Sequence, residues 1–125
     1  MMAHRVILVV EDHAPLLHVI AEMLERFGYD ARLAGTAADA YTFAKAERPD
    51  TILLDMNLPD ANGTQTLDEL HLLRPDVPII MVTANADVHL ARETLTRGAF
   101  DYVMKPFDMN RLGQVLDAAL DSQPR

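Results

Sequence analysis

The chain has 125 residues, half of them hydrophobic, which is enough for one domain with a core of its own. The absence of cysteine excludes disulfide bonds and thiolate zinc sites, and the formal net charge of −8 argues against a surface for nucleic acid. No apolar stretch approaches the roughly 20 residues of a membrane span, and the N-terminus has no secretory signal. We therefore expect no contact with a membrane and a cytoplasmic location.

The first half of the chain alternates between strand and helix patterns. Val6 to Val10 is a continuous apolar run typical of a buried strand. The helix that follows places these apolar residues on one stripe: Leu16, Leu17, Ile20, Met23, Leu24 and Phe27. Gly28 suits the left-handed cap that often ends a helix. After a weak strand from Asp30 to Ala34, Thr36-Ala37-Ala38-Asp39 has the form of a capping box and predicts a helix that ends near Glu47.

The second half continues the same alternation. Its predicted elements, in chain order, are a strand from Thr51 to Asp55, a helix from Gly63 to Leu73, a strand from Pro78 to Thr83, a helix from Val88 to Arg97, a strand from Ala99 to Met104 and a helix from Met109 to Leu120. Asp87 and Gly98 suit the two caps of the fourth helix. The residues of the last helix that should face inward are Leu112, Val115, Leu116, Ala119 and Leu120.

Strict alternation of short strands with helices predicts a parallel sheet covered by helices on both faces, an α/β fold. Right-handed crossovers leave few topologies open. We expect one domain over residues 1–125, with a core from about residue 5 to about residue 121. In such a fold, chemistry is done in the crevice at the carboxyl ends of the strands.

Polar side chains follow four of the predicted strands at that edge. They are Glu11 and Asp12 after the first strand, Asp55 at the end of the third, Thr83 at the end of the fourth and Lys105 after the fifth. Three carboxylates in one place repel one another and favour a hard cation such as Mg²⁺, which prefers oxygen ligands. Lys105 supplies the opposite charge, and Pro106 constrains the turn that aims it.

Each of these residues alone also has an ordinary structural explanation. Glu11 and Asp12 suit a helix N-cap, and Asp55 suits a turn that caps the following loop. Lys105 suits a solvated turn, and Thr83 is an ordinary residue at a strand end. The common position of all five at one sheet edge favours a functional site.

This combination resembles the receiver domains of two-component response regulators. The most specific stretches are LLDMNLPDANG, PIIMVTA and GAFDYVMKPF, and the resemblance extends from Val6 to Leu120. It implies a flavodoxin-like, five-stranded doubly wound sheet of strand order 2-1-3-4-5. It also implies a phosphoprotein that catalyses only its own phosphorylation and dephosphorylation, and is therefore not an enzyme with a separate substrate.

The resemblance assigns a role to each matching residue. Asp55 is the phosphoryl acceptor, and it holds Mg²⁺ together with Asp12, the backbone carbonyl of Asn57 and, through water, Glu11. Thr83 and Lys105 bind phosphoryl oxygens. Tyr102 is the aromatic switch, and Pro106 follows a cis peptide bond. Glu11 stands where many members have aspartate, and a longer arm still reaches a metal-bound water. Asn57 and Asn85 occupy positions that tune dephosphorylation. Tyr102 also suits a core aromatic.

The implied partners are a histidine kinase or a histidine phosphotransfer protein, together with an output domain or target protein and a phosphorylation-dependent homodimer. The surface that would switch comprises the fourth helix, the last strand and the last helix.

Three other classes of protein remain open. A phosphohydrolase of the haloacid-dehalogenase type normally has a second acid where this chain has Asn57. A flavodoxin-type FMN carrier needs a phosphate-binding loop after the first strand, which is absent here. An interaction module that never receives phosphate would not need the three acids Glu11, Asp12 and Asp55, all of which are present.

Overall fold

The computed structural model describes residues 4–84 and 88–122. The strands are β1 (Val6–Val10), β2 (Asp30–Ala34), β3 (Thr51–Asp55), β4 (Ile79–Thr83) and β5 (Asp101–Met104). The helices are α1 (Ala14–Arg26), α2 (Ala37–Ala46), α3 (Gly63–Leu73), α4 (Val88–Thr96) and α5 (Met109–Asp121). Two predicted positions, Asn85 and the helix cap Asp87, lie outside the described residues.

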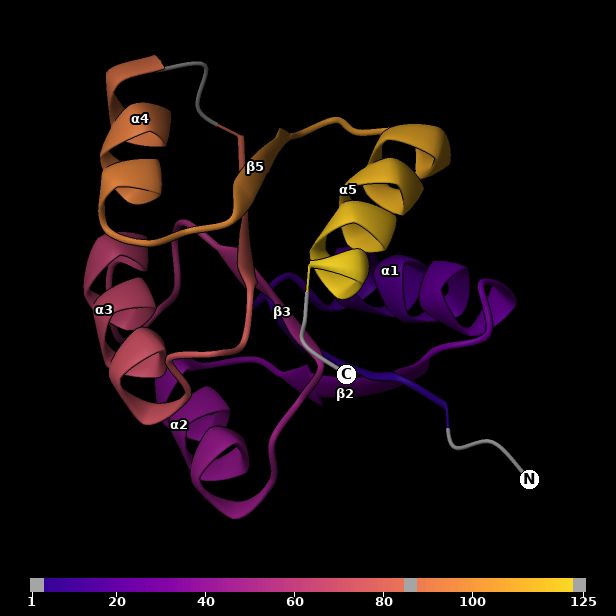
Figure 1. The fold of residues 1–125 in the computed structure, drawn as a ribbon, viewed down its shortest axis with the longest axis horizontal. Coiled ribbons are helices and arrows are strands. Elements are labelled where there is room, and N and C mark those ends of the chain that lie inside the picture. Colours follow the sequence, from indigo (N-terminus) through magenta and orange to yellow (C-terminus); the bar gives the residue numbers. More distant parts are fainter. Residues whose placement is uncertain (1–3, 85–87, 123–125) are drawn as a thin grey trace.

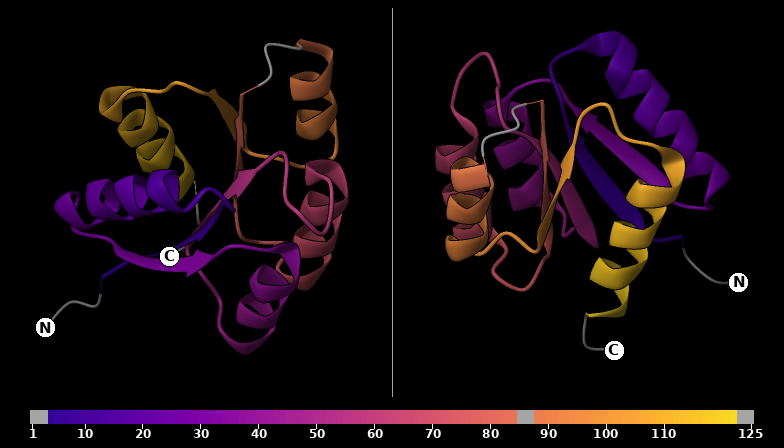
Figure 2. Two further views of the ribbon diagram at one scale, coloured as in Figure 1. Left: turned by 180° about the vertical axis from the view of Figure 1, so that it is seen from behind. Right: turned by 90° about the horizontal axis from the view of Figure 1, so that it is seen from above.

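The strands form one parallel sheet in the order β2-β1-β3-β4-β5, which confirms the predicted topology. Helices α1 and α5 cover one face, and α2, α3 and α4 cover the other (Figures 1 and 2). The two hydrophobic cores lie between the sheet and these two layers. Every residue of β3 and β4 is buried, because these two strands have a neighbour on either side and a helical layer on each face.

Within the described residues, three helices begin at a side chain that accepts a hydrogen bond from the first turn. The Thr36 hydroxyl accepts from the Asp39 amide at 3.1 Å, which confirms the predicted capping position at the start of α2. Asn62 caps α3 by accepting from the Gln65 amide at 2.8 Å, and Asp108 caps α5 in the same way. Such caps satisfy backbone donors that have no partner within the helix, so each start position is fixed by a local residue.

The junction of α4 and β5 differs from the prediction. The strand begins at Asp101 and not at Ala99, because the Ala99 amide donates to the Thr94 carbonyl at 3.0 Å and so closes the helix. Gly98 makes the reversal with a φ of +105°, a left-handed conformation that favours glycine. Of the two residues expected in the strand, Ala99 ends α4, whereas the Phe100 amide already donates to the Ile79 carbonyl of β4 at 2.8 Å.

Phe27 also departs from the prediction, which placed it on the buried stripe of α1. It follows the last helical residue and is 39% exposed, with its ring edge to face against Tyr29 at 6.4 Å between centroids. Gly28 turns the chain away immediately afterwards, with a φ of +89°. The apolar period of the helix therefore continues one residue beyond the helix itself. The five inward residues predicted for α5 are all buried.

Candidate functional site

The parallel register brings the predicted residues to one edge of the sheet. Val10 pairs with Leu54, and Asp55 pairs with Val82, so β1, β3 and β4 end at nearly the same level. Thr83 pairs with Met104, the residue before Lys105. Residues that are far apart in the sequence therefore meet because four neighbouring strands stop together, as the sequence predicted.

Glu11, Asp12 and Asp55 form a compact acidic cluster. Each offers a carboxylate oxygen, and these three atoms lie within 4.8 Å of one another. In octahedral Mg²⁺ coordination, with bonds of about 2.1 Å, oxygens on opposite sides of the ion are about 4.2 Å apart. The spacing and the all-oxygen donor set fit this ion after small side-chain adjustments. Glu11 and Asp55 are buried, whereas Asp12 is exposed, so the cluster opens to solvent on the Asp12 side.

Lys105 supplies the positive charge of the site. Its Nζ lies 2.7 Å from Glu11 Oε1 and 3.5 Å from Asp55 Oδ1. The Lys105 amide donates to the Thr83 carbonyl at 2.7 Å, which holds the Lys105 backbone beside the end of β4. The Lys105–Pro106 peptide bond is cis, as the family resemblance implied. The ammonium therefore sits between two buried carboxylates, closer to Glu11 than to Asp55.

Burial, together with unequal compensation by Lys105, separates the acidities of the two buried carboxyl groups. Burial raises the pKa of Asp55 to about 6, and repulsion by Glu11 contributes to the increase while Lys105 opposes it. Burial also disfavours ionised Glu11, but hydrogen bonds from Lys105 and from the His13 amide outweigh it and lower the pKa of Glu11. Burial disfavours the Lys105 ammonium as well, yet its contacts with Glu11 and Asp55 raise the Lys105 pKa. Of these two buried carboxylates, Asp55 is thus the one whose charge is less compensated.

This imbalance predicts that Asp55→Asn stabilises the metal-free protein at neutral pH. Because the folded-state pKa of Asp55 is raised from 3.8 to about 6, folding holds the proton more tightly, and stability is lost as the pH rises through 6. The penalty at pH 7.5 amounts to at most about 3 kcal/mol, and a neutral amide removes it. In urea unfolding at pH 7.5 with EDTA we expect the variant to be the more stable protein. The difference in stability between variant and wild type should shrink at pH 4.5 and on adding Mg²⁺. A difference of the same size at both pH values would contradict this charge imbalance.

Asn57 lies in the loop between β3 and α3, next to the acidic cluster. Its amide approaches Asp55 Oδ1 at 3.4 Å, and it forms an isolated antiparallel bridge with Asn62. The loop is tightly packed where it enters α3: a Cβ added to Gly63 would lie 2.6 Å from the Met56 carbonyl oxygen. The side chain of Asn57 is exposed, so its backbone is the part of the residue that the loop holds close to Asp55.

Thr83 and Tyr102 are not members of the acidic cluster. Both line a small apolar cavity between the sheet and α4, whose other lining residues are Met56, Met81, Leu90, Ala91 and Thr94. Thr83 is 5% exposed and Tyr102 is half-buried. Pro106 and Phe107 border a groove along α1, which Lys105 also lines. The predicted residues therefore divide into an ionic group and a cavity beside it.

Asp60, in the loop between β3 and α3, was not among the residues predicted from the sequence. Its carboxylate accepts hydrogen bonds from the Ala37 and Ala38 amides at 2.9 and 3.0 Å and so caps α2 from a distant part of the chain. No local pattern could have revealed this contact, because Thr36 already occupies the capping position of α2.

Comparison with known proteins places the chain in a family. The family model described as response regulator receiver domain matches residues 7–117, and the chain belongs to this family. A CheY-like response regulator receiver domain protein from Methanospirillum hungatei has 34% sequence identity and a TM-score of 0.92, with 97% of each chain covered. The receiver domain of the sensor histidine kinase PA1611 from Pseudomonas aeruginosa, solved with a magnesium ion coordinated in its active site cleft, has 36% identity and a TM-score of 0.87, with 96% of this chain and all of that chain covered.

Curated relatives are longer proteins. The transcriptional regulatory protein ZraR of Salmonella typhimurium is 36% identical over 114 residues, which cover 91% of this chain and 26% of ZraR. The chain thus spans about a quarter of the length of the curated relatives that it matches. Receiver domains are signalling domains of two-component systems that bind Mg²⁺ at an acidic pocket and interact with histidine kinases and output domains.

Within residues 4–84 and 88–122, none of the helices is long and apolar enough to cross a bilayer.

Proposed function

We propose that this chain is a phosphoryl-accepting domain in which Asp55 takes the phosphoryl group from the phosphohistidine of a histidine kinase or phosphotransfer protein. One observation carries the proposal: Glu11, Asp12 and Asp55 converge to within 4.8 Å, with the Lys105 ammonium against two of them. A cation, a nucleophile and a counter-charge for the phosphoryl oxygens can all be accommodated there. The match to the receiver family supports the same chemistry.

In the proposed reaction, a carboxylate oxygen of Asp55 attacks phosphorus while the phosphorus–nitrogen bond to imidazole breaks. The bonding electron pair returns to the imidazole nitrogen. A carboxylate is a weak nucleophile, so the rate must come from positioning and from neutralisation of charge on the transferred group. Asp12, Asp55 and the Asn57 carbonyl would hold Mg²⁺, with Glu11 acting through water. The bound ion would neutralise negative charge on the phosphoryl oxygens.

Lys105 and Thr83 would bind the phosphoryl oxygens of the product. The acyl phosphate carries about −1.5 to −2 charges, more than the carboxylate it replaces. Lys105 is already 3.5 Å from Asp55 and can pair with one phosphoryl oxygen. Thr83, on the neighbouring strand, would donate its hydroxyl to another. Moving Thr83 towards Asp55 would enlarge the cavity beside α4, and Tyr102, which also lines this cavity, would fill that space.

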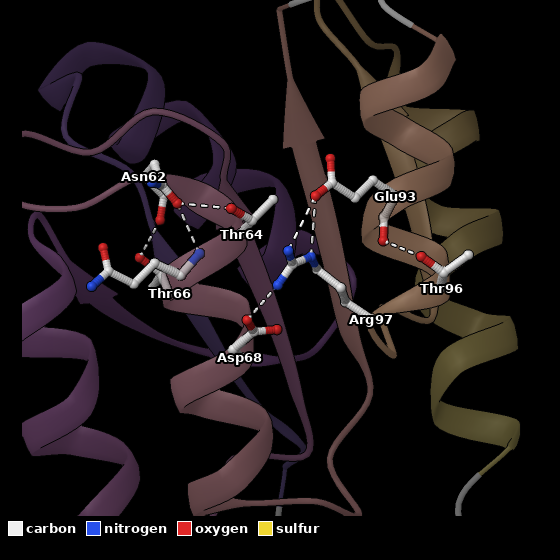
Figure 3. A network of polar contacts seen from close by, with 8 residues as sticks. Asn62, Thr64, Thr66, Asp68, Glu93, Thr96 and Arg97 are labelled. Carbon is white, nitrogen blue, oxygen red and sulfur yellow. Dashed lines mark hydrogen bonds and ion pairs between the residues drawn. The ribbon is translucent and has the colours of Figure 1, made fainter.

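The switching surface in this proposal comprises α4, β5 and α5. Arg97, just after α4, pairs with Asp68 on α3 at 2.6 Å and with Glu93 at 3.2 Å (Figure 3). These half-exposed pairs are worth about 1 kcal/mol or less. A hundredfold shift between two states needs about 2.7 kcal/mol, which new bonds to the phosphoryl group can supply. Backbone amide signals of α4 and β5 should therefore change more than those of α2 when the protein is phosphorylated; the reverse order would contradict this surface.

The phosphohydrolase alternative is less well supported. Such enzymes normally use a second carboxylic acid two residues after the nucleophile, and the side chain there is the amide of Asn57, which is exposed. We therefore propose a chain that turns over only its own aspartyl phosphate. Steady release of phosphate from a phosphomonoester, in excess of the protein, would favour the phosphohydrolase.

We propose that residues 1–125 form one receiver unit with a core from about residue 5 to about residue 121, located in the cytoplasm. The greater length of relatives such as ZraR supports an output domain or target protein as the recipient of the switch. A phosphorylation-dependent homodimer is a further partner in this proposal, and light scattering before and after phosphorylation would test it.

Removing the metal tests the proposed function. We expect wild-type protein incubated with acetyl phosphate and Mg²⁺ to gain the mass of one phosphoryl group, and to gain none when EDTA is present. The reason is that two buried carboxylates repel the incoming anion unless a cation compensates for them. Intact-protein mass spectrometry gives the result directly, and restored labelling on adding excess Mg²⁺ is the control. Equal labelling with and without EDTA would contradict the metal-dependent mechanism.

A further inference from the structure

Asp60 belongs to the loop between β3 and α3, yet its side chain binds the start of a different helix. Its two carboxylate oxygens accept from the amides of Ala37 and Ala38, the first two residues of α2, at 2.9 and 3.0 Å. These amides have no acceptor within their own helix. The positive end of the helix dipole favours a negative charge there, and the two hydrogen bonds hold the pKa of Asp60 below its ordinary value.

The start of α2 does not depend on Asp60 alone. The Thr36 hydroxyl already accepts from the Asp39 amide at 3.1 Å, which is the usual way for a helix to be capped by its own sequence. The two caps therefore differ in what they connect. The Thr36 bond connects the cap residue to the first turn of the same helix. The Asp60 bonds connect the β3–α3 loop to a helix that begins 23 residues earlier in the sequence.

The same loop is held at its ends by its own neighbours. Asn57 and Asn62 face each other in an isolated bridge, and the Asn62 side chain accepts from the Thr64 hydroxyl at 2.9 Å and from the Gln65 amide at 2.8 Å at the start of α3 (Figure 3). Asp60 lies between these two residues and is the point at which α2 restrains the loop. The loop that carries the Asn57 carbonyl is thus attached to α3 at its base and to α2 at its middle.

We propose that Asp60 is a positioning residue for the metal site, which holds the loop so that the Asn57 carbonyl faces the Glu11, Asp12 and Asp55 carboxylates. This inference rests on the proposed function, because it assumes that these residues bind Mg²⁺. It adds a residue that touches neither the ion nor the phosphoryl group. Groups that orient a ligand without touching the ion typically change metal affinity about 10- to 100-fold when they are removed.

Two variants separate positioning from helix capping. Asp60→Ala and Thr36→Ala each remove one side-chain cap from the same end of α2, so we expect each to lower the Tm by a similar amount. Only Asp60→Ala releases the loop. By calorimetric titration of the metal-free chain with Mg²⁺, we expect Asp60→Ala to weaken binding about tenfold and Thr36→Ala to stay within about twofold of wild type. Asp60→Asn keeps one acceptor oxygen and should restore part of the affinity.

A second measurement does not involve the metal. In the metal-free protein, Asp60→Ala should speed hydrogen exchange of the amides in residues 57–62, and Thr36→Ala should leave them near wild-type rates. Mg²⁺ affinity that is unchanged in Asp60→Ala, or weakened equally by both variants, would overturn this inference while leaving the proposed function standing. A wild-type chain that does not bind Mg²⁺ would overturn both.

Discussion

Replacing Asp55 with asparagine is expected to abolish phosphoryl uptake from acetyl phosphate and Mg²⁺. An amide oxygen carries no full negative charge and cannot form a stable acyl phosphate, so the acceptor is lost while the shape of the side chain is retained. The same substitution should make the metal-free protein more stable at neutral pH, since Asp55 is the less compensated of the two buried carboxylates. Urea unfolding of the same preparation then separates loss of the acceptor from loss of the fold.

A matched control for this variant is Asp121→Asn. Asp121 is exposed at the last residue of α5 and is remote in the fold from the carboxyl edge of the sheet. The substitution makes the same chemical change at a distant position, and we expect the Asp121→Asn protein to be labelled as fast as wild type. Undiminished labelling of Asp55→Asn, measured by intact mass over the same time course, would refute Asp55 as the acceptor.

Replacing Lys105 with methionine should slow phosphoryl uptake by about 10²- to 10³-fold, the usual cost of removing one group aimed at developing charge. Methionine retains most of the length of the side chain but has no charge to place near the phosphoryl oxygens. The Lys105 ammonium is mostly buried, with its Nζ 2.7 Å from Glu11 and 3.5 Å from Asp55.

Lys45→Met is the control, because the sequence contains only these two lysines and Lys45 is exposed in the last turn of α2. We expect Lys45→Met to keep the wild-type rate. The comparison should be made at saturating Mg²⁺, so that weaker metal binding does not contribute to the difference. A Lys105→Met protein that is folded, binds Mg²⁺ and is labelled within about threefold of wild type would show that Lys105 does not serve the reaction.

Most of the fold could be predicted because its determinants are local. Buried parallel strands appear as continuous apolar runs such as Ile52 to Leu54, and helices appear as stripes closed by Gly28 or opened by Thr36. The errors arose where tertiary packing or a cap competes with periodicity. Phe27 continues the apolar stripe of α1 past its end, and Ala99 donates its amide to the closure of α4 instead of to the sheet.

The members of the candidate site could also be predicted, because topology alone brings strand ends together. Residues after β1, β3, β4 and β5 have to meet at one edge whatever their side chains do in detail. The division of charge within the site could not be predicted. It depends on Lys105 lying closer to Glu11 than to Asp55, a difference of less than 1 Å between 2.7 and 3.5 Å. Sequence spacing carries no information at that scale.

Asp60 illustrates a second limit of the sequence. A loop aspartate that caps its own helix is recognisable from spacing, but Asp60 caps α2 from a position 23 residues later. The contact exists because α2 and α3 pack side by side on the same face of the sheet (Figure 1). Supporting residues of this kind become visible only when the elements are placed in space, and they are where variants outside the site should alter metal binding.

The most direct test of the account is to locate the phosphoryl group on the protein. Protein treated with acetyl phosphate and Mg²⁺ can be reduced with borohydride, which converts an aspartyl phosphate to homoserine, and then digested and sequenced by mass spectrometry. We predict homoserine at position 55 and at no other aspartate of the chain. A modified residue elsewhere, or an unmodified Asp55 in protein that has gained the mass of a phosphoryl group, would contradict the account.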